Sequence, residues 1–170
     1  ADVSSELWGG TFEAGFKFSS IDTESKLDFF DVLSNNTTFN NSLSDNFNYR
    51  ENIFAEYINF EKDWEKWSIA AGLRGEYTDI DAISRSFGQV NNQQYFDLFP
   101  SASFHYIIND NNGIGLSYSR SVERPRYQSL NPFKYFITER NFNGGNPKLV
   151  PAIEDKITLT FDHKGKLFFE

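Results

Sequence analysis

Few residues in this chain have the type and spacing that catalysis or metal binding requires. The two histidines, His105 and His163, stand outside any spacing typical of a metal site or a nucleophile pair. Asp79-Ile80-Asp81 offers oxygen atoms of the kind that Ca²⁺ prefers, but no loop of EF-hand spacing surrounds it. With no cysteine, the chain has neither a disulfide framework nor a thiolate metal site. We therefore expect no catalytic residue, no metal and no cofactor.

A better candidate is the long stretch after Tyr118, which is rich in arginine and proline. Its prolines each fix φ and remove a backbone donor, which bars regular strand pairing there; they are Pro125, Pro132, Pro147 and Pro151. Gly144-Gly145 permits positive φ, while Asn131 and Asn146 can complete turns with their side chains. The expected product is a rigid excursion between two strands. Most of its residues should only shape it, and the alternative is direct ligand contact by Arg124, Arg126, Tyr127 or Arg140.

The overall composition suits a sheet with one apolar and one wet face. Aromatic residues make up 18% of the chain, yet the mean hydropathy is −0.53 and only 39% of residues are hydrophobic. No run of about 18 apolar residues exists, which excludes transmembrane helices. The net charge of −8 argues against nucleic-acid binding, because neutralising phosphates requires clustered Lys and Arg. A membrane barrel and a soluble antiparallel sheet both fit these values.

Alternation of apolar and polar residues predicts strands. The clearest is Trp67–Thr78, where one parity is apolar and the other carries Ser68, Arg74 and Glu76. The same period predicts strands at residues 12–18, 101–108, 113–119 and 156–161, with weaker candidates at Lys26–Val32, Phe47–Phe60 and Lys166–Glu170. In Phe47–Phe60 both parities carry apolar residues. Placing Ile53, Ala55 and Tyr57 on the apolar face spares Glu56 from lipid.

The connections between these strands alternate in length. Ser19–Ser25, Glu61–Lys66, Asn109–Asn112 and His163–Gly165 are short, whereas Leu33–Asn46, Asp79–Gln94 and Ser121–Asp155 are long. Outer-membrane barrels have tight periplasmic turns and extended extracellular loops. A soluble sandwich has no reason to sort its loops in this way. The pattern therefore favours an antiparallel transmembrane β-barrel of the bacterial outer membrane.

Three blocks after Tyr118, in a fixed order, make the sequence recognisable. They are Arg124-Pro125, then Leu130-Asn131-Pro132-Phe133, then Gly145, Asn146, Pro147, Leu149 and Pro151. Upstream segments fit the same series: the alternating residues Tyr49 to Tyr57, Gly72-Leu73-Arg74 with Glu76 and Thr78, and Leu98-Phe99-Pro100-Ser101. With this series, most of residues 12–169 resembles the outer-membrane β-barrel domain of TonB-dependent receptors.

The resemblance implies that residues 1–170 are part of a larger barrel, about seven or eight of its antiparallel strands. It also implies energy-coupled uptake of a nutrient such as a siderophore, glycan or peptide. In the parent protein, a plug domain would fill the lumen and a TonB-type energy transducer would act on it; the plug is absent here. Three alternatives remain: a small complete outer-membrane barrel with a structural or adhesive role, a soluble β-barrel or sandwich that binds a ligand, and an outer-membrane hydrolase.

Two structural expectations follow. The chain lacks Met and a signal peptide, so we expect a processed or excised piece whose first and last strands do not pair with each other. We also expect one set of residues to face lipid, namely Ile69, Ala71, Leu73, Phe104, Tyr106, Ile114 and Leu116. Ser68, Arg74, Ser103 and Ser117 should face the lumen.

Overall fold

The computed structural model describes residues 1–34, 36–85, 88–138, 140–163 and 166–169. Most of the molecule is strand, and the one helix of the described residues is the single turn α1 (Tyr127–Leu130). The strands of the main sheet are β1 (Asp2–Leu7), β2 (Gly10–Leu27), β5 (Asp45–Asp63), β6 (Trp67–Ser84), β7 (Gln89–Asn109), β8 (Asn112–Glu123), β11 (Ala152–His163) and β12 (Lys166–Phe169). Two small hairpins are β3 (Phe30–Leu33) with β4 (Asn36–Phe39), and β9 (Tyr135–Thr138) with β10 (Asn141–Asn143).

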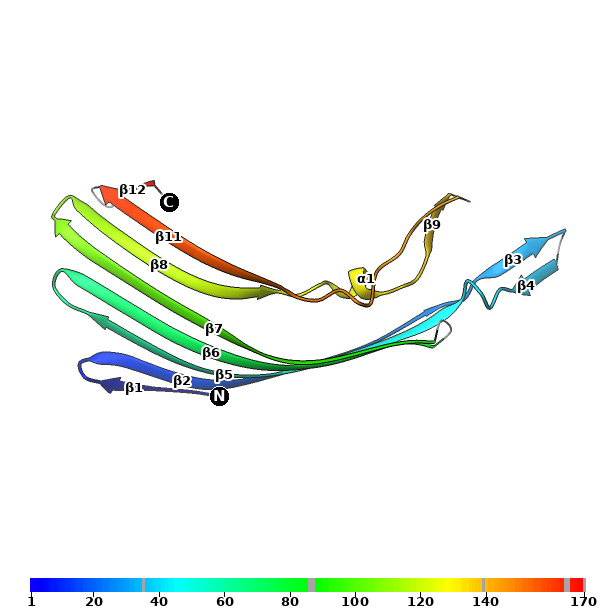
Figure 1. Ribbon diagram of the computed structural model, residues 1–170, viewed down its shortest axis with the longest axis horizontal. Coiled ribbons are helices and arrows are strands. Elements are labelled where there is room, and N and C mark those ends of the chain that lie inside the picture. Colours follow the sequence, from blue (N-terminus) through cyan, green and yellow to red (C-terminus); the bar gives the residue numbers. More distant parts are fainter. Residues whose placement is uncertain (35, 86–87, 139, 164–165, 170) are drawn as a thin grey trace.

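Eight antiparallel strands form one open sheet in the order β1-β2-β5-β6-β7-β8-β11-β12. The sheet is not closed, because β1 and β12 lie at its two opposite edges. The tight connections that follow β1, β5 and β7 lie at one end of the sheet, which we call the turn end. The C-terminal end of β6, the small hairpins and α1 lie toward the other, the loop end (Figure 1). The antiparallel fold and the count of strands agree with the expectation from the sequence.

Strand register confirms the predicted division of faces. Ile69 lies opposite Phe104 and Phe104 opposite Leu116, while Ser103 lies opposite Ser117. Directly paired residues share a face of the sheet, since side chains alternate along each strand. We call the first set the apolar face and the second the polar face. The polar face also carries the paired Arg74 and Glu76, as expected from their parity.

The predicted orientation of β5 is wrong. Its register with β6 sets Tyr57 opposite Arg74 and Ala55 opposite Glu76, so Ile53, Ala55 and Tyr57 lie on the polar face. Glu56 instead lies on the apolar face, opposite Gly75. The physical reason is that this orientation of β5 places three large side chains, Phe54, Ile58 and Phe60, on the apolar face. The partner of Glu56, Gly75, is followed on the same face of β6 by Tyr77, so Glu56 lies near the end of the apolar run.

Two predicted connections are strand instead. Ser19–Ser25 lies wholly within β2, and most of Asp79–Gln94 belongs to β6 and β7, which leaves only residues 85–88 between them. Residues 86 and 87 lie outside the described part. These segments are polar because the strands continue beyond the apolar zone, not because the chain turns. Asp22 pairs across the ladder with Arg50, whose Nη2 lies 3.1 Å from its Oδ2. Strict alternation of short and long connections is therefore wrong at this position.

The first third of the chain differs in further ways. The predicted strand Lys26–Val32 is divided between the end of β2 and β3, and the predicted loop Leu33–Asn46 contains β4 (Asn35 lies outside the described residues). β1 was not predicted, because Asp2–Leu7 lacks a clear apolar parity. At the other terminus the predicted strand Lys166–Glu170 corresponds to β12, with Glu170 outside the described residues. Lys164 and Gly165, in the predicted turn before it, also lie outside them.

Pro100 determines where the long excursion can enter the sheet. It pairs with Leu73 on β6, but the pairing of β7 with β8 reaches only from Asn109 to Ser101. A proline has no N–H to donate, so the ladder to β8 cannot continue through it. Beyond this point β8 pairs with β11 alone, up to Glu123 opposite Ala152. The chain between β8 and β11, residues 124–151, is the excursion, and Glu139 in it lies outside the described residues.

Candidate functional site

The excursion folds on itself before it contacts the sheet. The Asn131 side chain accepts a hydrogen bond from the Phe133 N–H at 3.0 Å, and that of Asn146 accepts one from Lys148 at 3.0 Å, as expected for turns. Gly145 donates to the Asn131 carbonyl at 2.9 Å. A Cβ at Gly145 would lie 2.5 Å from this oxygen, so this glycine is required by close approach rather than by positive φ.

This folded excursion packs onto the polar face of β5 and β6 at the loop end. Leu130 and Phe133 retain 5% and 2% of their exposure and join a buried cluster with Phe47 and Ile80. The remaining members of that cluster are Tyr49 and Ala82. The ring of Tyr127 lies 5.9 Å from that of Phe47, centroid to centroid. The predicted rigid excursion is therefore anchored on the sheet through its Leu-Asn-Pro-Phe block.

Arg124 joins the start of the excursion to two carboxylates of the sheet. Its Nη2 lies 2.5 Å from Glu76 Oε2, and its Nε lies 3.6 Å from Glu51 Oε1. Arg74 contacts the other oxygen of Glu76 at 2.5 Å, and Tyr49 donates its hydroxyl to Glu51 at 3.1 Å. Burial acts to lower the pKa of Arg124, but the hydrogen bond and charge of Glu76 outweigh it, so that pKa is raised. The guanidinium is charged at every physiological pH.

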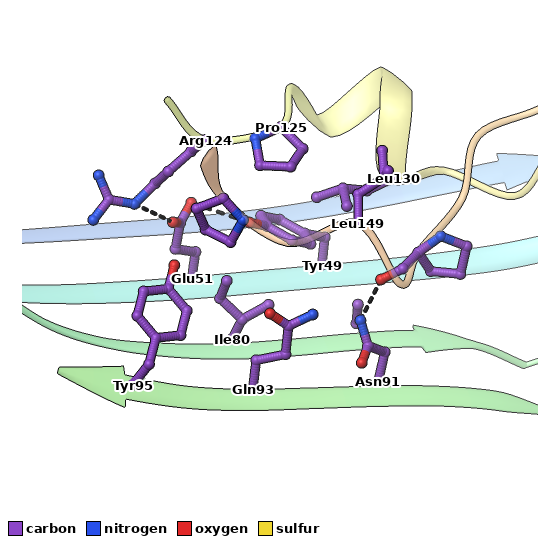
Figure 2. Close-up of a pocket in the computed structure, with 13 residues that line it drawn as sticks. Tyr49, Glu51, Ile80, Asn91, Gln93, Tyr95, Arg124, Pro125, Leu130 and Leu149 are labelled. Atoms are coloured by element: carbon purple, nitrogen blue, oxygen red, sulfur yellow. Dashed lines mark hydrogen bonds and ion pairs between the residues drawn. The ribbon is translucent and has the colours of Figure 1, made fainter. Parts of the chain in front are cut away.

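The space between the excursion and the sheet is almost filled. A cavity of about 10 Å³ remains there, enough for about one water molecule. Figure 2 shows Arg124 and Pro125 above it, Leu130 and Leu149 beside it, and side chains of three strands below it. Three buried polar atoms in its lining have no hydrogen-bond partner among the described residues: Glu51 Oε1, Tyr95 Oη and Arg124 Nε. The site therefore has unused hydrogen-bonding capacity.

The four residues weighed as ligand contacts do not lie together. Arg124 and Tyr127 belong to the packed junction between excursion and sheet. Arg126 and Arg140 are exposed, Arg140 in the connection between β9 and β10. Of the last motif block, Pro147, Leu149 and Pro151 line the small cavity. Direct ligand contact by any of the four remains a prediction.

Sequence reasoning missed the sheet's contribution to this site. Glu51, Glu76 and Thr78 are buried on the polar face, and Asn91 donates its side-chain N–H to the Pro147 carbonyl. In the sequence, Glu51 and Glu76 stand out only as members of motif segments, and Glu76 also by its polar parity. A signal was present, because two acidic residues on a face that also carries Phe47 and Ile80 require a cation nearby. The sequence offered no way to choose Arg124 among the candidates.

The histidines belong to small polar contacts at the turn end. His105 Nε2 lies 3.1 Å from Asp162 Oδ1, and His163 Nδ1 lies 2.7 Å from Asn112 Oδ1. In the described residues no group of three His, Cys, Asp or Glu is placed to hold a metal ion. No helix of the described part is long and apolar enough to cross a membrane.

Comparison with known proteins decides the family. The sequence model described as "Outer membrane protein beta-barrel family" matches residues 1–170. The chain belongs to this outer-membrane β-barrel family. No curated protein matches the chain. The family places the protein in the bacterial outer membrane, so the apolar face meets lipid and the polar face lines the barrel interior.

The apolar face of this barrel segment has the dimensions of a bilayer core. On β6 it runs from Trp67 through Ala71 and Leu73 to Tyr77, which is about 33 Å along the strand. At a strand tilt of about 40° this corresponds to about 25 Å of height, the usual height of the apolar band. We call this zone the belt. Since periplasmic turns are the short ones, the turn end faces the periplasm and the excursion lies on the outer side.

Proposed function

We propose that this chain is a segment of the barrel of a TonB-dependent receptor that takes up a nutrient by energy-coupled transport. A siderophore, a glycan or a peptide would be the substrate. In the parent protein the partners would be outer-membrane lipid, a plug domain in the lumen and a TonB-type energy transducer. Nucleic acid is not among the proposed partners, and no enzymatic activity is proposed.

One observation carries this proposal. The blocks on which the resemblance to these receptors rests are the residues that join the excursion to the lumen wall. Arg124 of the Arg-Pro block binds Glu76, Phe133 of the second block is buried on the wall, and Pro147 of the third accepts a hydrogen bond from Asn91. A purely structural or adhesive barrel has no need of an outer loop fixed inside its own lumen. A transporter does, since a loop so placed controls entry.

The open sheet is a second support. A ring of eight strands would require β1 beside β12, whereas these strands form opposite edges. A larger barrel accommodates the segment without rearrangement. Such a barrel has room for a lumen through which a nutrient passes, while small barrels are filled by side chains.

The buried polar atoms without a hydrogen bond at the junction suggest how a ligand would act. Glu51 Oε1, Tyr95 Oη and Arg124 Nε can accept or donate further hydrogen bonds. A nutrient with hydroxyl, amide or carboxylate groups that bound beside the excursion would complete them where the junction opens, because the closed space holds about one water molecule. A rigid excursion would bind it without a large ordering cost. Arg126 and Arg140, exposed on the same excursion, would make the first contacts.

The test is growth on a limiting nutrient, measured in the native host. Deleting the gene and deleting the energy transducer should impair growth on the same nutrient. In the intact protein, replacing Arg126–Gly144 with a Gly/Ser linker should lower uptake at least about tenfold, equivalent to about 1.4 kcal/mol. Heat-modifiable gel mobility checks that the barrel still assembles. A folded linker variant with normal uptake, or a gene deletion whose effect the transducer deletion does not share, would contradict the proposal.

A second candidate function has an observation of its own. The two small hairpins expose large apolar side chains, among them Val32 at 72% and Ile137 at 62%, with Phe29 and Phe136 in ring contact between them. Such a patch on the outer side suits adhesion by a small complete barrel. Loss of surface attachment with unimpaired growth, after deletion of the gene, would favour this alternative.

A further inference from the structure

All three tryptophans of the chain gather at one point of the turn end. Trp8 lies in the connection between β1 and β2, Trp64 begins the connection between β5 and β6, and Trp67 is the first residue of β6. The rings of Trp64 and Trp67 are stacked, with centroids 3.6 Å apart. Trp8 is 81% exposed, although tryptophan is large and apolar. Tryptophan prefers the level of lipid headgroups, which is where the lower boundary of the belt lies.

Lys62 lies among these three rings. It pairs with Ile69 and therefore stands on the lipid-facing side. Its ammonium lies 4.7 Å from the centre of the Trp64 ring and donates a hydrogen bond to the Trp8 carbonyl. The side chain thus reaches from the belt toward the periplasmic boundary, with its stem along apolar surface. One of the three ammonium donors is used by Trp8, which leaves two for another acceptor.

The charge of Lys62 is unmatched, unlike that of its counterparts. Four Lys and Arg residues occupy the lipid-facing parity of strands β1 to β11: Lys26, Arg50, Lys62 and Arg120. Lys26 pairs with Asp28, Arg50 with Asp22 and Arg120 with Asp155, at 2.8 to 3.1 Å. Among the described residues no ion pair includes Lys62. The acidic residues of neighbouring strand positions, Glu6, Glu61 and Asp63, have the lumen parity.

The local backbone is arranged around this lysine. Trp8 has a φ of 53° and Gly9 a φ of 70°, and positive φ at a bulky residue such as Trp8 is unusual. A type I′ turn needs two such residues, and asparagine or aspartate normally takes the first place. Gly10 leaves room for the lysine, because a Cβ there would lie 2.9 Å from Lys62 Cβ. Strain of this kind at a ring beside an unmatched cation points to a ligand site.

We propose that Lys62, flanked by Trp8 and by the Trp64–Trp67 stack, binds the phosphate of a glycerophospholipid in the periplasmic leaflet. The ammonium would donate to phosphate oxygens, and the indole rings would lie against the glycerol and the upper acyl chains. A phosphate is the anion that lipid supplies at this depth, and within the described part of the chain no carboxylate forms an ion pair with the lysine. The protein would therefore carry a lipid bound at one place on its periplasmic rim.

The experiment measures retained lipid on the intact outer-membrane protein by native mass spectrometry. Protein in detergent is mixed with palmitoyl-oleoyl phosphatidylglycerol, and in a separate sample with dioleoylglycerol, which has the chains but no phosphate. We expect phosphatidylglycerol to be retained and dioleoylglycerol not. Lys62→Gln should lower the retained phosphatidylglycerol about fivefold, and Lys62→Arg should keep it.

Lys17→Gln is the matched control, because Lys17 has the lumen parity on the neighbouring strand β2. It should leave retention unchanged. Heat-modifiable mobility shows that each variant is folded, so that only folded protein is compared. Equal retention by Lys62→Gln and the unaltered protein would overturn the proposal. Equal retention of dioleoylglycerol would also overturn it, because binding would then depend on the chains rather than on the phosphate.

Discussion

The belt and the junction under the excursion are built on the same strands, but different surroundings stabilise them. In the belt, Leu73, Phe104 and Leu116 remain 41 to 52% exposed within the protein, since lipid is their packing partner. At the junction, Phe47 and Phe133 are almost completely buried by protein alone. The polar groups differ in the same way, because Arg120 is paired at the surface and Arg124 is paired inside. One sheet thus carries a region that depends on the membrane and a region that the protein packs by itself.

The largest expected effect is at Phe133 in the junction. Phe133→Ala removes a side chain that is 2% exposed, which should destabilise the docked excursion by about 3–5 kcal/mol. Hydrogen exchange of the Gly145 and Asn146 amides, which bond to Asn131 and Ser129, measures this opening. Phe136→Ala in the exposed β9 hairpin should change it by less than about 1 kcal/mol. Comparable effects at both positions would mean that the junction is not a packed unit.

The belt should respond to charge rather than to volume. Leu73→Arg places a cation near the middle of the apolar band and should cost roughly 2–4 kcal/mol. Ser103, which pairs with Ala70, lies on the lumen side, where water or protein can solvate a charge, so Ser103→Arg should cost much less. Urea titration of folding into lipid vesicles gives both values for the intact protein. If the two variants were equally tolerated, the assignment of faces would be wrong.

The smallest expected effect is the difference in stability between variants of two arginines that are four positions apart. Arg124→Gln leaves the buried Glu51 and Glu76 with a weaker partner, and it should cost about 1–3 kcal/mol, since Arg74 still pairs with Glu76. Arg120→Gln breaks an exposed pair with Asp155, which solvent screens, and should cost much less. Thermal unfolding of both variants is the measurement. A larger loss for Arg120→Gln would reverse the comparison.

The belt could be predicted because its pattern is local. Alternation along Trp67–Thr78 and residues 101–119 identified the strands and their faces correctly, since the period of two is imposed by the pleat itself. Where strands leave the bilayer, this signal disappears. Ser19–Ser25 resembles a turn in composition, yet it is strand. Every residue of this segment pairs with a residue of β5, whichever face its side chain occupies.

The junction could be predicted only in part, because its contacts depend on distant pairing. The prolines and asparagines of the excursion indicated a rigid fold, and their turn roles are confirmed. The contact between Arg124 and Glu76 spans 48 positions and depends on two strand registers, that of β6 with β7 and that of β7 with β8. Glu56 shows the same limit, since its facing follows from Phe54, Ile58 and Phe60 together and not from its own charge.

The folded excursion also changes what it costs to add the last strands to the sheet. β1 and β2 are joined across Trp8 and Gly9, whereas 28 residues separate Glu123 of β8 from Ala152 of β11. As a free chain, the longer connection would lose roughly 2 kcal/mol more closure entropy, at about 0.6 kcal/mol per doubling. Hydrogen bonds from Gly145 and Asn146 back to Asn131 and Ser129 close it internally. With Phe133 packed against the sheet, the folded excursion acts as a short connection that holds β11 beside β8. It thereby joins the strands up to β8 to the strands from β11 onward.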